Sequence, residues 1–128
     1  MSAWTPDELN KISNAEELQI ASLRRDGTTQ TPVTIWVVRV REDIFVRAYK
    51  GRTSPWFGGV QTCYKGQIKA DGVVKDVDFV EEANAEINDQ VDSAYLTKYS
   101  RYPTYVAPMV TPGARAATIK LVPRSNGL

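Results

Sequence analysis

Two β-rich runs separated by a short polar turn constrain the fold of this chain more than any other feature. The first run, residues 33–40, reads Val-Thr-Ile-Trp-Val-Val-Arg-Val, and the second, residues 44–49, reads Ile-Phe-Val-Arg-Ala-Tyr. Both are rich in β-branched and aromatic residues, which favour strands. With Glu42 and Asp43 as the turn between them, the two runs predict an antiparallel hairpin.

A two-residue turn at this point also predicts which residues pair across the hairpin. Val40 then pairs with Phe45, Val38 with Arg47, and Trp36 with Tyr49. Arg47 therefore shares a face with two aromatic side chains. Two roles fit this position: stacking of the guanidinium on the rings at a barrel rim, or contact with a bound anion.

The first run is apolar at both odd and even positions in its middle, which predicts a strand covered on both faces, as in a barrel wall with another element packed outside. Further strands are predicted at residues 18–22, 67–70, 73–80 and 117–122. The pair around Asp71-Gly72 carries the strongest hairpin signal in the chain. Together the six runs predict a mainly β (α+β) fold, a six-stranded antiparallel barrel with two main helices.

Helix signals lie between the strands. Thr5-Pro6-Asp7-Glu8 is a capping box with proline at the first helical position, so residues 1–14 predict an N-terminal helix over one barrel end. Ser54-Pro55 predicts a second helix start with Ser54 as cap, and Asn84 caps a long helix that runs to about Arg101. Residues 103–112 read as irregular and residues 124–128 as a polar tail. The tyrosines at positions 95, 99, 102 and 105 are interpreted as packing groups with hydroxyls at the surface.

Composition excludes several classes of function. The 128 residues fit one domain, and 42% hydrophobic residues are enough for one core. A net charge of +1 argues against a general nucleic-acid binder. No apolar run is long enough to span a bilayer, and the N-terminus lacks a signal-peptide pattern, so we expect a cytoplasmic protein with no membrane partner.

The chain contains no histidine and a single cysteine, Cys63. This excludes Ser-His-Asp and Cys-His catalysis, histidine-ligated metal or haem, and a cysteine-based zinc site. An acidic stretch at residues 76–92 fits no calcium loop and reads as a solvated face. We therefore expect no metal. The sequence identifies no catalytic residue, and any reaction must use carboxylates, Tyr, Lys, Arg, backbone amides or a bound cofactor.

A basic loop follows the first hairpin and is the leading candidate site. Arg47, Lys50 and Arg52 lie within a few residues of each other, beside Gly51 and just before the Ser54-Pro55 helix start. Cations, exposed backbone amides and the positive end of a helix dipole together favour a phosphate. Solvated surface charges are the other interpretation. The loop matches neither a Walker motif nor a Gly-x-Gly-x-x-Gly turn.

The order of the predicted elements resembles that of split β-barrel proteins that bind flavins and deazaflavins, including the pyridoxamine-phosphate-oxidase-like fold. Sequence motifs are similar to those of an uncharacterised bacterial family of unknown function, over roughly residues 15–124. They are Arg-x-Asp-Gly-Thr at 24–28, Thr-Pro-Val-Thr-Ile-Trp-Val-Val at 31–38, Val-Arg-Ala-x-x-Gly-Arg at 46–52, Trp-Phe-x-Gly at 56–59, Gly-x-Ile-x-Ala-x-Gly at 66–72, Tyr-x-x-Lys-Tyr at 95–99 and Ala-Arg-Ala-Ala-Thr at 114–118.

A more distant resemblance, to deazaflavin-dependent nitroreductases, implies where a cofactor would lie. By position, Pro32, Val33 and Thr34 would lie along the ring system of FMN or a deazaflavin. Lys50, Gly51 and Arg52 would meet its phosphate, and Trp56 would pack beside it. The basic loop adds Arg47 to this candidate site. The fold class also implies a homodimer, because its cofactor often sits at a subunit interface.

Phe57-Gly58-Gly59 stands where that family usually carries an asparagine soon after the tryptophan. Two hypotheses therefore stay open. The first is a flavin- or deazaflavin-binding, oxidoreductase-like protein in which the cofactor performs hydride chemistry. The second is a cofactor-free module that binds another small ligand, or an interaction partner, on the same barrel. Whether the chain is an enzyme stays open as well.

Overall fold

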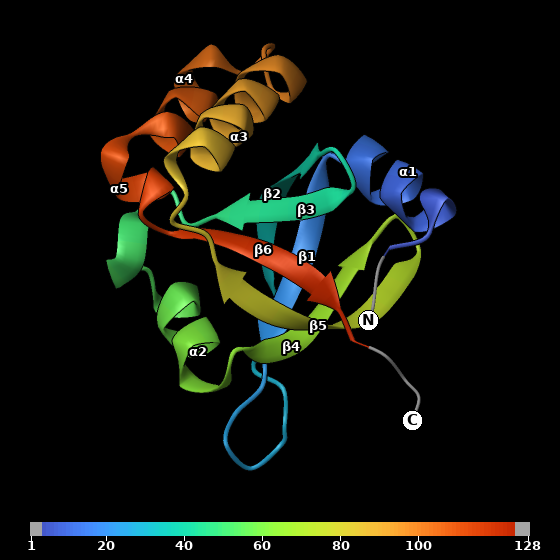
Figure 1. Ribbon diagram of the computed structural model, residues 1–128. Coiled ribbons are helices and arrows are strands. Elements are labelled where there is room, and N and C mark those ends of the chain that lie inside the picture. Colours follow the sequence, from blue (N-terminus) through green and yellow to red (C-terminus); the bar gives the residue numbers. More distant parts are fainter. Residues whose placement is uncertain (1–3, 125–128) are drawn as a thin grey trace.

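The computed structural model describes residues 4–124 of the chain. Six antiparallel strands form a closed barrel in the order β1-β2-β3-β6-β5-β4, with β4 paired back onto β1 (Figure 1). The strands are β1 (Glu17–Ser22), β2 (Val33–Val40), β3 (Asp43–Arg47), β4 (Lys65–Ala70), β5 (Val73–Glu81) and β6 (Thr118–Pro123). The prediction of a six-stranded antiparallel barrel is confirmed.

The β4–β5 hairpin turns at the predicted dipeptide. Asp71 and Gly72 both have positive φ, 46° and 81°, and Ala70 pairs with Val73 across the turn. Positive φ at both central residues is what a tight, right-twisted hairpin requires, and Asp-Gly tolerates it at little cost. The local sequence is therefore sufficient to specify this turn.

The β2–β3 hairpin forms, but the predicted register is wrong. Val40 pairs with Asp43 and Val38 with Phe45, so the turn consists of Arg41 and Glu42, and Arg41 has a φ of 58°. Asp43 continues the strand instead of turning. Because the shift is an even number of residues, each side chain keeps its face, and Arg47 still lies on the outer face with Trp36.

The barrel interior is filled by apolar side chains from all six strands. Leu18, Val37 and Ile119 are fully buried there. Helix α1 (Pro6–Asn14) covers one end of the barrel and adds Leu9 and Ile12 to the same core (Figure 1). The capping box of Thr5 and Glu8 is present, which confirms the predicted start of this helix. Helix α2 (Pro55–Cys63) follows a 3-10 turn, Gly51–Thr53, and buries Phe57 and Val60.

A layer of helices covers the outer face of β2 and β3 (Figure 1). Helix α3 (Ala85–Lys98) starts at its predicted cap, Asn84, and packs Val91 and Tyr95 on Val38 and Phe45. The strand is therefore covered on both sides, as its sequence predicted. The segment predicted as irregular instead forms short helical turns: α4 (Pro103–Val106), a 3-10 helix (Ala107–Val110) and α5 (Pro112–Arg115). Each has a proline in its first turn, where the missing N–H costs no hydrogen bond.

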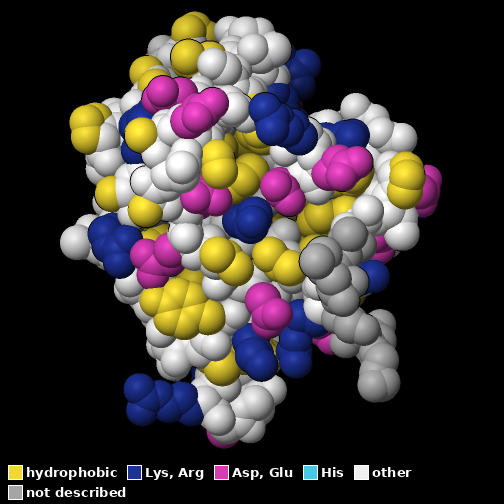
Figure 2. All heavy atoms as spheres, in the orientation of Figure 1, with side chains coloured by type: hydrophobic (Ala, Val, Ile, Leu, Met, Phe, Trp, Pro, Cys, Tyr) yellow, Lys and Arg dark blue, Asp and Glu magenta, His cyan; other side chains and the backbone are white. Residues whose placement is uncertain are grey.

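The surface carries mixed charge. Figure 2 shows basic and acidic side chains interspersed on one face, with apolar side chains between them. This pattern fits the net charge of +1. Within the described part of the chain, no helix is long and apolar enough to cross a bilayer.

Candidate functional site

A pocket of about 650 Å³ lies between the barrel and the layer of helices. Its size falls in the range of small-molecule sites, roughly 300–1,000 Å³. Strand β2 forms one wall, residues 47–56 form a second, and α4 with the following 3-10 helix forms the third. The residues that line the pocket include Val33, Thr34, Trp36, Lys50, Ser54, Trp56, Tyr105 and Met109.

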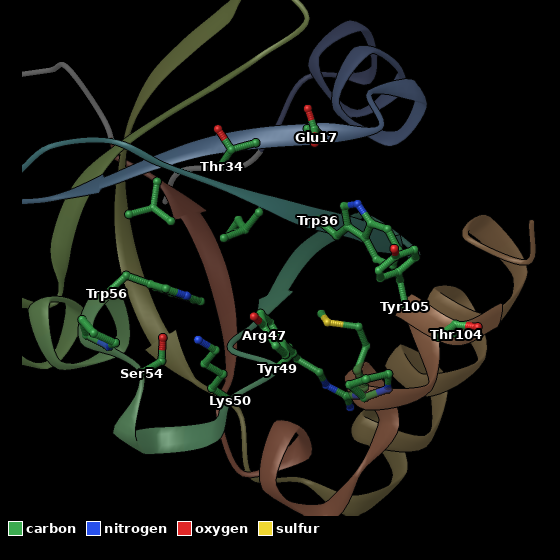
Figure 3. Close-up of a pocket in the computed structure, with 15 residues that line it drawn as sticks. Glu17, Thr34, Trp36, Arg47, Tyr49, Lys50, Ser54, Trp56, Thr104 and Tyr105 are labelled. Carbon is green, nitrogen blue, oxygen red and sulfur yellow. The ribbon is translucent and has the colours of Figure 1, made fainter. Parts of the chain in front are cut away.

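Aromatic rings lie at both ends of the pocket. Figure 3 shows Trp56 at one end and Trp36 with Tyr105 at the other. The Trp36 ring is held from behind, because it stacks on buried Tyr99 with ring centroids 3.9 Å apart and planes 4° from parallel. Tyr105 is 72% exposed. One end is therefore rigid and aromatic, and the pocket stays open toward solvent.

Lys50 and Ser54 supply polar groups on the second wall. Figure 3 shows the Lys50 ammonium and the Ser54 hydroxyl pointing from this wall toward the strand that carries Thr34. The Lys50 Nζ lies 5.7 Å from the Tyr49 ring centroid, and among residues 4–124 no carboxylate is within ion-pair distance of it. Lys50 is therefore available to an anionic ligand.

Ser54 stands at the N-cap position of α2, but its predicted side-chain cap does not form. The amides of Phe57 and Gly58 both donate to the Ser54 backbone carbonyl, each at 3.1 Å, so the first turn closes on the main chain. Ser54 is 7% exposed and lines the pocket. Its hydroxyl is thereby left for a ligand at the positive end of the helix dipole.

Arg47 is held by the protein itself. It is 1% exposed and donates to Thr118 Oγ1 at 2.8 Å, to the Met109 carbonyl at 2.9 Å, and to the carbonyl and Oδ1 of Asn88 at 3.0 and 2.9 Å. It also forms an ion pair with Asp92. Arg47 therefore has a structural role that differs from the two roles expected from the sequence, stacking on aromatic rings and contact with a bound anion. Arg47 ties the barrel wall to α3 and to the 3-10 helix that closes the pocket.

The other residues of the basic loop diverge. Arg52 pairs with Glu81 at 2.7 Å and donates to the Ala116 carbonyl at 3.0 Å, with its guanidinium 5.1 Å from the Phe57 ring centroid. Gly51 is buried with a φ of 80°, a conformation that favours glycine, and shapes the loop. Pro32 is exposed and lies outside the pocket lining. The pocket therefore brings together Val33, Thr34, Arg47, Lys50 and Trp56 of the predicted set, but not Pro32, Gly51 or Arg52.

Burial and local contacts shift several pKa values near this layer. Burial raises the pKa of the Tyr95 and Tyr99 hydroxyls well above their ordinary value, so both stay protonated at neutral pH. Burial lowers the pKa of Lys98 to about 8, against the opposing pull of Glu16. Burial alone would raise the pKa of Glu81, but hydrogen bonds from Tyr64, Arg52 and Gln61 outweigh it and hold the pKa below its usual value.

Sequence reasoning missed the third wall of the pocket. Tyr105 and Met109 lie in the segment predicted as irregular, and Tyr105 was interpreted as part of a packing cluster. The packing role is confirmed for buried Tyr95 and Tyr99, but their hydroxyls do not lie at the surface: Tyr95 donates to the Trp36 carbonyl and Tyr99 to the Glu16 carbonyl. The run of prolines at positions 103, 108 and 112 was the signal available, since proline favours the first turn of a helix. It does not indicate where those turns pack.

A family model described as an uncharacterized protein conserved in bacteria (DUF2255) matches residues 8–121. The chain belongs to this family. Comparison with curated proteins gives no match. Among residues 4–124, no group of three His, Cys, Asp or Glu side chains is placed to hold a metal ion.

Several solved structures share the fold of this DUF2255 chain. HutZ, the heme storage protein from Vibrio cholerae, is 13% identical with a TM-score of 0.64, over 98% of this chain and 93% of that one. A FAD-binding protein from Mesorhizobium loti is 14% identical with a TM-score of 0.61, over 96% and 92%. An F420-H2-dependent reductase is 17% identical with a TM-score of 0.57, over 84% and 93%. At such identities the likeness establishes the fold, a split β-barrel, as predicted.

Proposed function

We propose that this protein binds a flavin-like cofactor, FMN or a deazaflavin, in the pocket between β2 and residues 47–56. One observation carries the proposal. The open pocket has aromatic rings at both ends, and among the described residues the Lys50 ammonium that faces it has no ion-pair partner. The Ser54 hydroxyl also faces the pocket at the start of a nine-residue helix and makes no capping hydrogen bond. A FAD-binding protein and an F420-H2-dependent reductase that share this fold support the proposal.

The donor set fits such a group. Apolar and aromatic walls suit a planar ring system, and Val33, Thr34 and Trp56 would hold it. An ammonium and a hydroxyl beside a helix N-terminus suit a phosphate, and Lys50 and Ser54 would hold that end. Arg47, Gly51 and Arg52 then shape the site without contacting the phosphate. When bound, the cofactor supplies hydride chemistry, and the chain contributes orientation and electrostatics.

Titration with FMN, FAD and F420, followed by tryptophan fluorescence and visible absorbance, tests the proposal. We expect Lys50→Ala to weaken FMN binding about tenfold, because a charge-assisted hydrogen bond is lost. Lys69→Ala is the matched control, since Lys69 is exposed on β4, away from the pocket lining. Riboflavin, which lacks the phosphate, should bind wild type less tightly than FMN. Equal affinities for riboflavin and FMN would remove the phosphate assignment.

A cofactor-free binding module is the second candidate. It is favoured by the ion pairs that Arg47 and Arg52 form within the protein. Among residues 4–124, Lys50 is then the cation of this loop that has no carboxylate partner. A single lysine suits a small monoanion or a neutral aromatic molecule better than a cofactor phosphate. If none of the three cofactors binds to wild type, the cofactor proposal fails and this candidate replaces it.

We also propose that the protein forms a homodimer that covers the pocket. Val33, Tyr49 and Tyr105, all at the pocket, are 37%, 55% and 72% exposed. Exposed apolar side chains that surround a pocket favour a protein contact. Light scattering at several concentrations measures the mass directly, and a monomer at high concentration would contradict the dimer.

A further inference from the structure

A second, smaller pocket of about 130 Å³ adjoins the main pocket. The two pockets share Val33, Pro55 and Trp56 in their linings. Trp56 therefore stands where the two cavities meet. Val33 and Trp56 belong to the candidate cofactor site, but the polar side chains of the small pocket, Ser22 and Gln30 among them, do not line the main pocket.

Two unpaired polar side chains meet in the small pocket. Ser22 is 7% exposed and Gln30 is half-buried, and neither side chain has a hydrogen-bond partner among residues 4–124. A Cβ placed on Gly59 would lie 2.7 Å from Ser22 Oγ and 2.9 Å from Gln30 Nε2. Both groups therefore converge above the backbone of Gly59, where a side chain would displace them. Neither group is sealed from solvent, because both line the open space of the pocket, so each is available to water or to a ligand.

The chain holds these groups in place by local structure. Residues 24–28 form a tight turn closed by Arg24 N–H donating to the Thr28 carbonyl at 2.7 Å. Just beyond the turn, Gln30 N–H donates to the Ser22 carbonyl at 2.9 Å. This second bond fixes Gln30 beside the last residue of β1. The pair of polar side chains is thus positioned by backbone hydrogen bonds before any ligand arrives.

The lining decides what kind of group fits. Its remaining members include the apolar side chains Ile20 and Val60, and no charged residue takes part. A charged group there would lose its hydration without gaining a counter-ion, which is unfavourable. A hydroxyl and a carboxamide can each donate and accept, so they match a neutral group that does both. Trp56 beside them offers a surface for an aromatic ring.

We infer that the small pocket is a binding subsite for the neutral carboxamide of an aromatic ligand, whose ring lies against Trp56. Ser22 and Gln30 pair with the amide, and Gly59, which has no side chain, leaves the room that these two side chains occupy. The two pockets share Val33, Pro55 and Trp56, but the inference does not rest on the cofactor proposal, since its polar groups, Ser22 and Gln30, lie outside the main pocket.

Three matched probes test the subsite by protein NMR: benzamide, benzoate and toluene. The signals to follow are the Gly59 amide and the Trp56 indole. We expect benzamide to shift both signals saturably, and benzoate and toluene to bind at least about tenfold more weakly. Benzoate would lose the hydration of its charge without gaining a counter-ion, and toluene can form no hydrogen bond to Ser22 or Gln30. Ser22→Ala should weaken benzamide binding by about fivefold.

The neighbouring glycines provide the matched pair of variants. Gly59→Ala fills the space between Ser22 and Gln30 and should abolish benzamide binding. Gly58→Ala makes the same chemical change one residue earlier in α2, where a Cβ meets nothing within 4 Å, and should leave it intact. FMN titration of both variants reports separately on the main pocket.

Several outcomes would overturn the subsite. They are equal benzamide affinity in the two glycine variants, equal binding of the three probes to wild type, or a shift at Trp56 without one at Gly59. If Gly59→Ala does not fold, the Ser22→Ala/Gln30→Leu double variant decides instead. Benzamide affinity within twofold of wild type in that variant rejects the proposal. A crystal structure with one ordered water between Ser22 and Gln30, which benzamide does not displace, rejects it as well.

Discussion

Replacement of Arg47 by methionine tests whether the barrel and the helical layer are joined by one buried side chain. Methionine keeps most of the apolar stem and removes the guanidinium. Five hydrogen bonds are lost, to Thr118, Asp92, Met109 and twice to Asn88. A net contribution of roughly 1 kcal/mol for a neutral hydrogen bond, and more for a charged one, sets an upper bound of several kcal/mol.

The expected loss is smaller than that sum, because two of the partners stay paired. Asp92 keeps its ion pair with Arg115, and Asn88 Oδ1 still accepts from the Thr118 hydroxyl at 2.7 Å. The Met109 carbonyl loses the guanidinium as its donor. We therefore expect Arg47→Met to lower the free energy of unfolding by about 3 kcal/mol, a large share of a typical domain's stability.

Urea denaturation followed by circular dichroism measures this change. Arg39→Met is the control, because Arg39 makes exposed hydrogen bonds to the Arg41 carbonyl and to Asn10, and its loss should cost less than about 1 kcal/mol. A double-mutant cycle with Asp92→Asn should give a coupling of at least about 1 kcal/mol. If Arg47→Met is no less stable than Arg39→Met, the cost of burying the guanidinium equals its gains, and the structural role given to Arg47 is refuted.

Two further predictions concern α3. Lys98 has a lowered pKa of about 8, so between pH 8 and its ordinary 10.5 the unfolded chain binds more protons than the folded one. Burial of the charged Lys98 side chain therefore destabilises the folded state, and this penalty is fully present below pH 8. It disappears as the pH rises through that window, so the free energy of unfolding rises with pH. The free energy of unfolding of wild type minus that of Lys98→Met, measured by urea titration, should rise between about pH 8 and 10.5. A difference that does not change with pH would contradict the buried position of Lys98. Asn84→Ala removes the cap to the Ile87 amide at 2.9 Å and should cost about 1 kcal/mol; unchanged stability would show that water replaces the cap.

Most of the barrel could be predicted from local patterns. Alternating apolar residues and the Asp71-Gly72 turn act over a few residues, and so does the capping of α1 by Thr5 and of α3 by Asn84. The prediction of the β2–β3 register failed because no glycine or asparagine marks the turn, and Arg41 takes the positive φ of 58° instead. The choice of Arg41 and Glu42 depends on how both strands pair with their other neighbours.

The sequence predicted only part of the candidate site, because only some of its residues lie close to local turn and helix signals. Val33, Thr34, Lys50 and Trp56 follow turn and helix signals close to them in sequence, and all four line the pocket. Tyr105 and Met109 come from a segment whose packing is set by distant contacts, above all the hydrogen bond from Arg47 to the Met109 carbonyl. No local pattern indicates such a contact.

The sequence by itself determined the strands, most turns, the helix starts and a cluster of three cations, because each depends on residues within one turn or one strand. Only the tertiary structure decided which of those cations is left for a ligand. Arg47 is buried where α3 closes over β3, Arg52 reaches Glu81 on β5, and Lys50 points into the pocket. The physical reason is that a charge takes its partner from whatever packs beside it, and that neighbour is set by the fold.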